Sequence, residues 1–260
     1  MKDFRHRWLP GGYVFALLSL IISLNTSTTL AAPVQRGTSP TQTTHMMGYW
    51  KFDEGSGSIA LDSSGHHRDG AISGAVYSTD HAPVKGSTYS LSFDGVQNLV
   101  SVPDSSGLDF SATDQMTISL WFNLSSLPGI WHAIGKRAGC DLTSINYQLA
   151  YDSRGLLFDS GGNIVATGIT NIPTGVWMHF AVTYNPTLQK LVIYVNGKKA
   201  TSQTNYMLSA KNTAPLLIAE SGTCGYTFPG NLDEVCILRQ TLSASQVAEL
   251  AGGRPCNKVS

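Results

Sequence analysis

Short stretches in which apolar and polar residues alternate follow one another along the chain from residue 47 onward. A two-residue period is typical of β-strands with one buried face, and clusters of Gly, Pro, Asn, Asp and Ser separate the stretches as turns would. The pattern therefore predicts a domain built from many short strands. We expect strands at 47–53, 89–95, 99–103, 116–124, 132–137, 146–152, 156–160, 177–184, 190–196 and 215–220.

One hairpin and one helix have clear local signals. The strand run KLVIYVN (190–196) ends at Asn196-Gly197, the dipeptide that favours a two-residue turn with positive φ. The segment 242–250 is the helix candidate, because Ser243 and Gln246 form a capping box and Gly252 supplies a stop. Many strands and one short helix in a domain of roughly 210 residues predict an all-β, two-sheet antiparallel sandwich.

Composition and charge exclude some partners. The chain has 260 residues, of which 13% are charged, and its 17 Lys and Arg balance its 17 Asp and Glu. Binding to nucleic acid or to an anionic membrane surface rests on an excess of positive charge. We therefore expect neither kind of partner.

The N-terminal sequence is typical of an export signal. Three basic residues precede the apolar segment 13–24, which is too short for a typical transmembrane helix, and small residues follow it at 28–32. We expect a signal peptide at 1–32, with an uncleaved anchor as the alternative. Residues 33–45, rich in Thr, Pro and Gln, are expected to be a flexible linker, and 46–260 the folded domain. The mature protein would be extracellular or periplasmic, without stable membrane insertion.

The four cysteines agree with export. All lie beyond the predicted signal peptide, and none has the C-x-x-C spacing of a zinc or redox site, so disulfide bonds are expected. Three connectivities are possible. We favour Cys140–Cys224, which joins two Gly-rich loops, with Cys236–Cys256, which would pin the C-terminal tail to a strand.

A set of short motifs occurs in a recognisable order. It comprises YWKFDEGSG (49–57), DSSG (62–65), DG (69–70), LSFDG (91–95), TISLWF (117–122), the segment 177–198 and GNLDEVCILRQTLSASQVAEL (230–250). This order resembles that of the laminin-G-like, or concanavalin A-like, jelly-roll domains of secreted proteins. The resemblance implies two curved antiparallel sheets, often with bound calcium, in a lectin-like or adhesive module. Members of that family bind sugars or proteins, so the fold alone leaves the ligand open.

The motifs of catalysis are missing from the sequence. Glycanases of this fold carry carboxylates at i, i+2 and i+4 on one strand face, as in E-x-D-x-E, and this chain has no such run. Asp233 and Glu234 are adjacent, so we expect them on opposite faces of a strand. His66 and His67 fall in a turn without further metal ligands nearby in sequence. We therefore expect a protein that is not an enzyme.

Two aspartates are candidate calcium ligands. Asp233 alternates with Val235 and Ile237, so its carboxylate is expected to point to the core side, where it needs a partner. Backbone N–H groups are one possible partner. A calcium ion is the other, with Asp94 as the second ligand implied by the family resemblance and Asp62 behind it.

The candidate ligand site lies in two unusual loops, 127–147 and 219–231. They combine aromatic rings, which can cover the C–H face of a sugar, with carboxylates for its hydroxyls. A distant similarity to pentraxins implies calcium ligands in the second loop, although most of that acidic cluster is absent here. The alternative to a ligand-binding role is that Trp131 and Phe228 cap the edge of the sandwich. The predicted ligand-binding residues are Trp131, Asp141, Tyr147, Glu220, Tyr226 and Phe228.

The other strand aromatics are expected in the core. Trp50, Trp121 and Trp177 each lie in an alternating pattern, which favours burial against the opposite sheet. His179 is expected to be packed or hydrogen-bonded within its strand. The sequence thus predicts a secreted, non-catalytic lectin-like module for a carbohydrate or cell-surface glycoconjugate. An extracellular protein-interaction or adhesion module is the main alternative, and a degenerate glycoside hydrolase the third.

Overall fold

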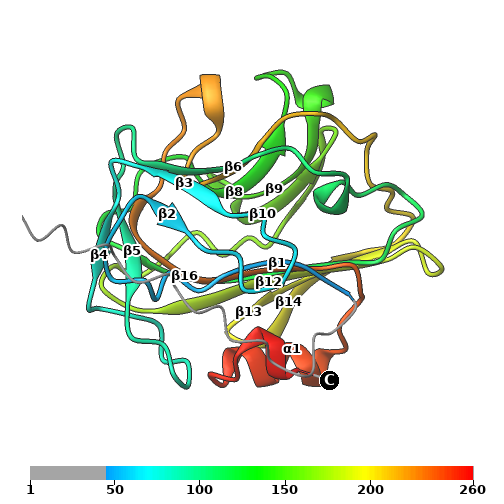
Figure 1. The fold of residues 1–260 in the computed structure, drawn as a ribbon. Coiled ribbons are helices and arrows are strands. Elements are labelled where there is room, and N and C mark those ends of the chain that lie inside the picture. The colour runs from blue at the N-terminus through cyan, green and yellow to red at the C-terminus, as the bar shows by residue number, and fades with distance from the viewer. Residues whose placement is uncertain (1–44, 260) are drawn as a thin grey trace, which may run out of the picture. The chain divides into compact units, whose positions relative to one another are not determined.

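The computed structural model describes residues 45–259. The predicted signal peptide (1–32) and all but the last residue of the predicted linker (33–45) lie outside the described residues. Two antiparallel sheets of eight strands each pack face to face (Figure 1). This confirms the predicted all-β jelly-roll sandwich with one short helix. Within this part of the chain, no helix is long and apolar enough to cross a membrane.

The strands divide into two sheets, which we call sheet A and sheet B. Sheet A has the order β14-β13-β12-β7-β16-β5-β4, with β1 also paired to β16, and sheet B has the order β11-β10-β9-β8-β15-β6-β3-β2. Sheet A comprises β1 (Met46–Trp50), β4 (Val76–Ser78), β5 (Ser90–Asp94), β7 (Met116–Leu124), β12 (Met178–Asn185), β13 (Lys190–Val195), β14 (Lys198–Gln203) and β16 (Pro229–Leu238). Sheet B comprises β2 (Ile59–Ala60), β3 (Gly70–Ser73), β6 (Leu99–Val102), β8 (Trp131–Arg137), β9 (Ile145–Asp152), β10 (Gly155–Ser160), β11 (Asn163–Ala166) and β15 (Leu216–Ile218). The helix is α1 (Ala244–Ala251), and short 3₁₀ turns lie at Ser106–Leu108, Leu142–Ser144, Gly222–Cys224 and Cys256–Lys258.

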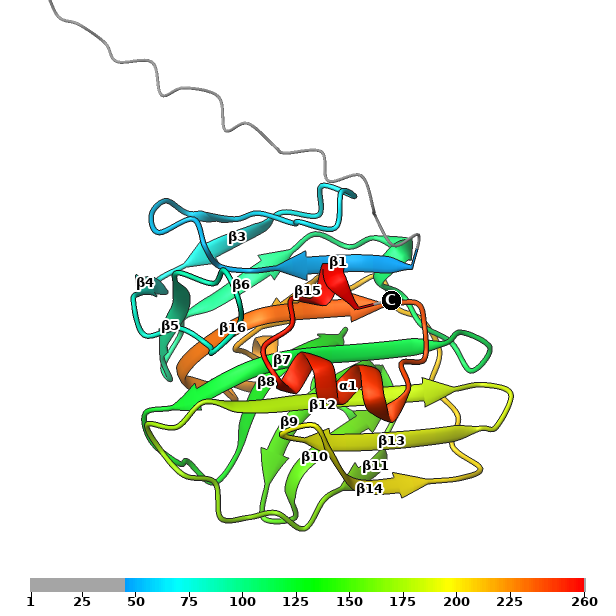
Figure 2. The same cartoon turned by 90° about the horizontal axis from the view of Figure 1, so that it is seen from below.

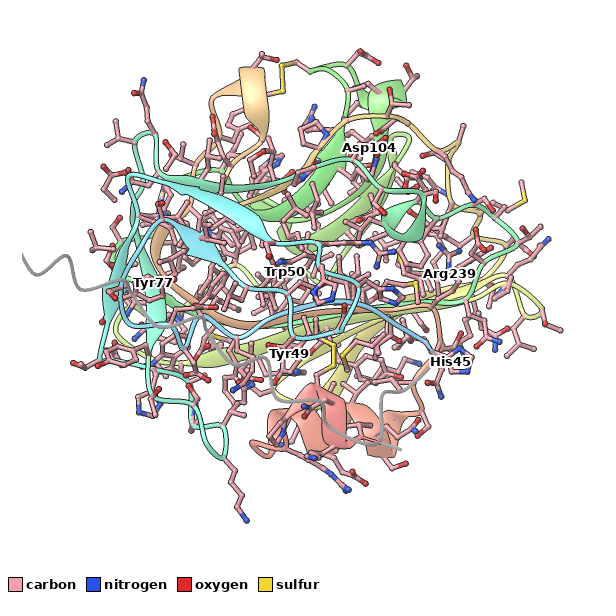
Figure 3. All side chains as sticks on the ribbon, viewed as in Figure 1. His45, Tyr49, Trp50, Tyr77, Asp104 and Arg239 are labelled. Carbon is pink, nitrogen blue, oxygen red and sulfur yellow. A yellow bond between two sulfur atoms is a disulfide. The ribbon has the colours of Figure 1, made fainter. Side chains whose placement is uncertain are left out.

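The main core fills the space between the sheets. Alternate residues of the strands point inward, as the sequence pattern predicts, and Trp50 and Phe122 of sheet A are fully buried there. Neighbours on β1 diverge: Trp50 lies in the main core, whereas Tyr49 points to the outer face of sheet A (Figure 3). β1 therefore has an apolar residue on the outer face of sheet A that needs cover.

The C-terminal segment covers part of that outer face. Figure 2 shows α1 lying across β12 and β13, where Val247 and Leu250 join a second apolar cluster. The predicted capping box of Ser243 with Gln246 is confirmed, and Gly252 ends the helix. The Cys236–Cys256 disulfide ties the tail to β16 and confirms that pairing. Closing a loop of this length stabilises a fold by about 3 kcal/mol.

A β-bulge in β16 changes which residues face outward. On β7, Trp121 and Ser119 pair with Asp233 and Cys236, so β16 carries one extra residue between them, and Glu234 has a φ of 53°. Asp233 and Glu234 consequently both lie on the outer face of sheet A. The predictions that Asp233 points to the core side and that the two carboxylates face opposite ways are both wrong, because alternation stops at a bulge.

The remaining predictions for single strand residues have mixed outcomes. His179 is buried in β12 and its Nε2 lies 2.8 Å from the Ser119 hydroxyl, which confirms a hydrogen-bonded strand histidine. The turn at Asn196-Gly197 has φ values of 49° and 74°, as a two-residue hairpin requires. Trp121 and Trp177 pack on the outer face of sheet A rather than against the opposite sheet. For these two indoles the prediction of core packing is wrong.

Candidate functional site

Three of the predicted ligand-binding residues lie in the core. Trp131, Tyr147 and Phe228 are fully buried, so they cannot form a platform for a ligand in solution. Trp131 stacks on Tyr151 with ring centroids 5.5 Å apart and meets the edge of Phe228 at 5.3 Å. The prediction for these three residues is wrong. Their side chains point inward from strands or strand ends, although the surrounding sequence has the composition of a loop.

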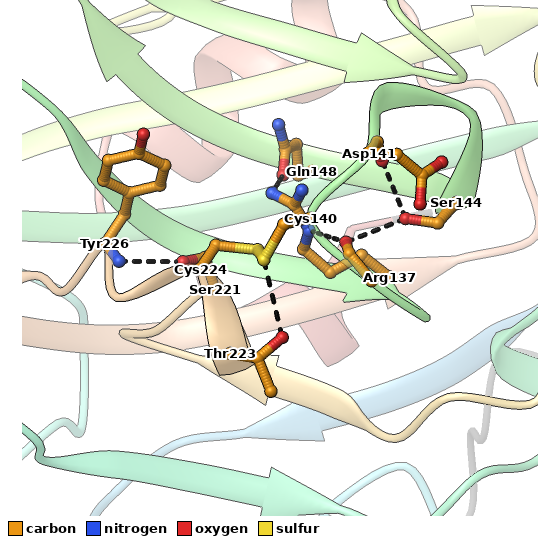
Figure 4. Close-up of a disulfide and its surroundings, with 10 residues drawn as sticks. Arg137, Cys140, Asp141, Ser144, Gln148, Ser221, Thr223, Cys224 and Tyr226 are labelled. Atoms are coloured by element: carbon orange, nitrogen blue, oxygen red, sulfur yellow. Dashed lines mark hydrogen bonds between the residues drawn. A yellow bond between two sulfur atoms is a disulfide. The ribbon is translucent and has the colours of Figure 1, made fainter.

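The other three predicted residues stay at the surface, around a disulfide. Cys140 and Cys224 are bonded, with Cα atoms 5.3 Å apart, which confirms the second predicted pairing. The bond joins the segment after β8 to the segment after β15 (Figure 4). Asp141 lies in the first of these segments, and Glu220 and Tyr226 lie in the second. The structure thus gathers these three residues at one edge of the sandwich.

Tyr226 is the aromatic residue that can meet a ligand here. Its side chain is 40% exposed, and its ring stacks on His132 with centroids 5.3 Å apart and planes 21° from parallel. The backbone N–H of Tyr226 donates to the Ser221 hydroxyl at 2.9 Å, which holds the turn in place. His132 lies under the ring in β8 and is almost fully buried. One ring face of Tyr226 is therefore supported by the protein, and the side chain stays in contact with solvent.

A chain of hydrogen bonds fixes a cation beside Tyr226. Arg137 Nε donates to the Gly139 carbonyl at 2.8 Å, and its Nη1 donates to Gln148 Oε1 at 3.0 Å. Gln148 Nε2 in turn donates to Asp159 Oδ2 at 3.3 Å. Arg137 is only partly buried, and within residues 45–259 its Nη2 has no hydrogen-bond partner. This guanidinium is oriented by its neighbours and keeps a donor for a ligand.

Two carboxylates lie on the rim of the same region. Asp141 is exposed, and the hydrogen bond from the Thr143 hydroxyl at 2.6 Å lowers the pKa of its carboxyl. Burial raises the pKa of Glu220, which is half-buried beside the disulfide-bonded turn. The Asp141 carboxyl therefore ionises at a lower pH than that of Glu220.

His132, which lies under the Tyr226 ring, is a neutral histidine. Burial, with the nearby Arg137 charge, lowers the pKa of His132 to about 3. The imidazole under Tyr226 is thus uncharged at physiological pH and adds an apolar surface rather than a second cation. Burial also raises the pKa of Asp159, whose Oδ1 accepts from the Gly162 N–H at 2.9 Å.

Sequence reasoning missed His132, Arg137, Gln148 and Asp159. All four lie on the face of sheet B that points away from the core. Gln148 and Asp159 are paired with each other, and each follows or precedes a core residue, Leu149 in β9 and Phe158 in β10, so their own side chains point outward. The signal was present as polar residues at alternate positions in NYQLAYD and LLFDS. That alternation shows the face, but not which strands lie side by side.

The two aspartates predicted as calcium ligands are not brought together. Asp94 of β5 pairs with Pro229 of β16. Pro229 is four residues before Asp233 on β16, which corresponds to about 13 Å along the strand. Asp233 is fully buried, and its Oδ2 accepts from the Ala82 N–H at 2.9 Å and the Ser87 hydroxyl at 3.0 Å. Asp94 Oδ1 accepts instead from the N–H of Val96 at 2.8 Å. This pair does not fit one ion. Asp233 has a backbone N–H partner in Ala82, as the alternative expected, and also the Ser87 hydroxyl.

The described residues offer no other candidate metal centre. Among residues 45–259, no group of three or more His, Cys, Asp or Glu side chains could hold a metal ion. Asp62 is buried and accepts from the N–H groups of Tyr49 and Ser64. His66 and His67 are exposed in a turn, as predicted.

Comparison with known families identifies the fold. A model of the concanavalin A-like lectin/glucanases superfamily matches residues 94–248, which is 155 of the 260 residues. No curated protein matches the chain.

Solved structures with the same architecture come from larger glycan-related proteins and toxins. Domain 4 of AbnA, a GH43 extracellular arabinanase from Geobacillus stearothermophilus solved with arabinotriose, is 23% identical with a TM-score of 0.61, over 80% of this chain and 98% of that one. The binding domain of Paraclostridial Mosquitocidal Protein 1 is 17% identical with a TM-score of 0.63, over 80% of this chain and 52% of that one. Trypanosoma rangeli sialidase is 16% identical with a TM-score of 0.61, over 81% of this chain and 33% of that one. The chain thus spans about half of the toxin domain and a third of the sialidase, and at these identities the likeness shows the fold.

Proposed function

The chain belongs to the concanavalin A-like lectin/glucanases superfamily, and from this premise we propose that it is a non-catalytic module that binds carbohydrate beside the Cys140–Cys224 disulfide. The observation that carries the proposal is the exposed Tyr226 ring stacked on His132 with Arg137 and Asp141 nearby. An aromatic face covers the C–H side of a sugar ring, and a fixed donor and acceptor orient its hydroxyls.

The geometry supports a site that is formed before the ligand arrives. Tyr226 is held by Ser221 and His132, Arg137 by Gln148, and the two loops by their disulfide. Side chains that are already ordered lose little conformational entropy on binding. A shallow site of this kind can therefore retain a small neutral glycan.

The structure offers little room for a glycosidase at its acidic pair. Asp233 and Glu234 share one face, and burial raises their pKa values to about 8 and about 7, a property seen in catalytic acids. However, the pocket that Glu234 lines with His179 and Leu250 has a volume of about 10 Å³, which suits one water molecule. A sugar ring cannot enter it, which supports a binding role over hydrolysis.

We place the protein outside the cytoplasm. Two disulfides in one domain favour an oxidising compartment, and the expected signal peptide agrees with it. A carbohydrate or a cell-surface glycoconjugate is then the partner. AbnA domain 4 was solved with arabinotriose, so this trisaccharide is the first probe, followed by a broad glycan array.

The experiment compares Tyr226→Ala with Leu188→Ala, an exposed apolar residue in the hairpin between β12 and β13. Loss of the ring should weaken glycan retention by about 1–2 kcal/mol, roughly 5- to 30-fold, without lowering the melting temperature. The control should bind like the wild type. Full retention by Tyr226→Ala would refute a site at this ring, and if no glycan is retained at all, the protein-interaction alternative takes precedence.

A further inference from the structure

A second group of side chains with sugar-binding chemistry lies on the opposite sheet. Asn123 of β7 pairs in register with Asn231 of β16, which pairs with Ser92 of β5. Phe122 pairs with Met178, so the next position beside Asn123 is Trp177, just before β12 begins. These residues form one row across the outer face of sheet A, at the end that α1 does not cover.

Asp80 lies over this row and binds three of its side chains. Its Oδ1 accepts from Trp177 Nε1 at 2.8 Å, and its Oδ2 accepts from Asn123 Nδ2 at 3.1 Å and Asn231 Nδ2 at 3.4 Å. The Asp80 carbonyl also accepts from the Ser90 hydroxyl at 2.6 Å. An exposed carboxylate is thereby held in one orientation by neutral donors.

The Asp80 carboxylate is exposed, and the group keeps hydrogen-bonding capacity that its neighbours do not use. Within residues 45–259, no Lys or Arg forms an ion pair with Asp80. A carboxylate has about four acceptor positions, and three are occupied here. Asn123 Oδ1 is buried without a hydrogen-bond partner. Trp177 is half-buried, and its neighbour in the chain, Val176, is 49% exposed.

We propose that Trp177, Asp80, Asn123 and Asn231 form a second binding site for a neutral sugar residue. The indole provides the apolar face, and Asp80 accepts a hydrogen bond from a sugar hydroxyl at its remaining acceptor position while the amides fix its orientation. These hydrogen bonds also anchor the loop before β5, and the exposed Asp80 carboxylate keeps one acceptor position that this anchoring does not use. The site lies on sheet A and the Tyr226 site beside sheet B, so one chain can hold two glycans and link two glycan-bearing surfaces.

The test uses variants on both sides of the sandwich. Trp177→Ala removes the indole, and Val176→Lys places a long cationic side chain at the exposed position next to Trp177 in the chain. The purified protein and these variants, with Tyr226→Ala and the control Leu188→Ala, are applied to a glycan array and titrated with arabinotriose. Melting temperatures are measured in parallel. On the array, we expect Val176→Lys to bind one set of glycans at least five-fold more weakly. In the titration, we expect it to lose one of two binding equivalents. Its melting temperature should equal that of the wild type.

The outcomes separate this inference from the proposed function. If Tyr226→Ala abolishes all binding and Val176→Lys and Trp177→Ala have no effect, the second site is overturned and the first stands. If Val176→Lys abolishes all binding and Tyr226→Ala has no effect, the second site stands and the proposed one fails. Retention of no glycan overturns both.

Discussion

The buried acidic pair in the bulge of β16 makes the stability of the protein depend on pH. Glu234 accepts a hydrogen bond from the Tyr49 hydroxyl, and its Oε1 is buried without a partner. Asp233 accepts from the Ala82 and Ser87 donors. Burial is the main cause that raises the pKa of Asp233 to about 8 and of Glu234 to about 7, and repulsion between the two contributes to the rise for Asp233.

The direction of the effect follows from proton binding. A carboxyl whose folded pKa lies above its unfolded value binds more protons in the folded state, so stability falls as pH rises from the unfolded pKa to the folded one. For this pair the window extends from about pH 4 to pH 8. Each extra proton corresponds to about 1.4 kcal/mol per pH unit.

Buried neutral His132 and His179, whose pKa values are lowered to about 3, act in the opposite direction below about pH 6.5. The net fall should therefore appear between pH 6.5 and 8, at about 2 kcal/mol for one proton.

The measurement is the free energy of unfolding in urea at pH 5, 6.5 and 8 for the wild type, Glu234→Gln and Asp94→Asn. Gln still accepts from Tyr49 but cannot ionise, so Glu234→Gln should gain about 2–3 kcal/mol relative to wild type between pH 5 and 8. Asp94→Asn changes an exposed carboxylate on neighbouring β5 and should show no such trend. An equal difference between Glu234→Gln and wild type at every pH would refute the reasoning, because it would mean that Glu234 ionises normally in the folded protein.

Three further predictions concern the core, a buried ion pair and calcium. Trp131→Ala should destabilise the fold by about 3–5 kcal/mol, because the ring is fully buried, and a guanidinium denaturation curve checks this. Lys136→Met should cost about 3–5 kcal/mol by leaving Asp104 and Asp109, 2.6 and 2.8 Å from the ammonium, without their cation; a denaturation midpoint equal to wild type would contradict it. Calcium binding stays a prediction, tested by elemental analysis and by melting with calcium and with chelator. Because Asp94 and Asp233 do not share a site, Asp94→Asn should leave any calcium-dependent shift in melting temperature unchanged.

The alternating pattern was sufficient for the architecture because it depends on local period and turn chemistry. It placed ten strands, the hairpin at Asn196-Gly197 and the capped helix at their observed positions, within a few residues, but it did not predict the short strands β2, β3, β4 and β11. The two disulfides are the connectivity that the sequence favoured among three possible ones. Signal peptide and linker concern residues outside the described part of the chain and stay predictions.

Tertiary structure decided which of the unusual loop residues reach solvent. Trp131 and Phe228 have the composition of a binding loop, yet both pack into the core, because strand pairing determines the face of each side chain. One extra residue at Glu234 reversed the expected direction of Asp233, a change that no period-two pattern can show. Tyr226 on His132, and Asp80 on Asn123 and Asn231, unite residues from strands and loops far apart in sequence. The local sequence determined the strands of this protein, but its candidate sites depend on strand order and register, which arise from contacts across the whole sandwich.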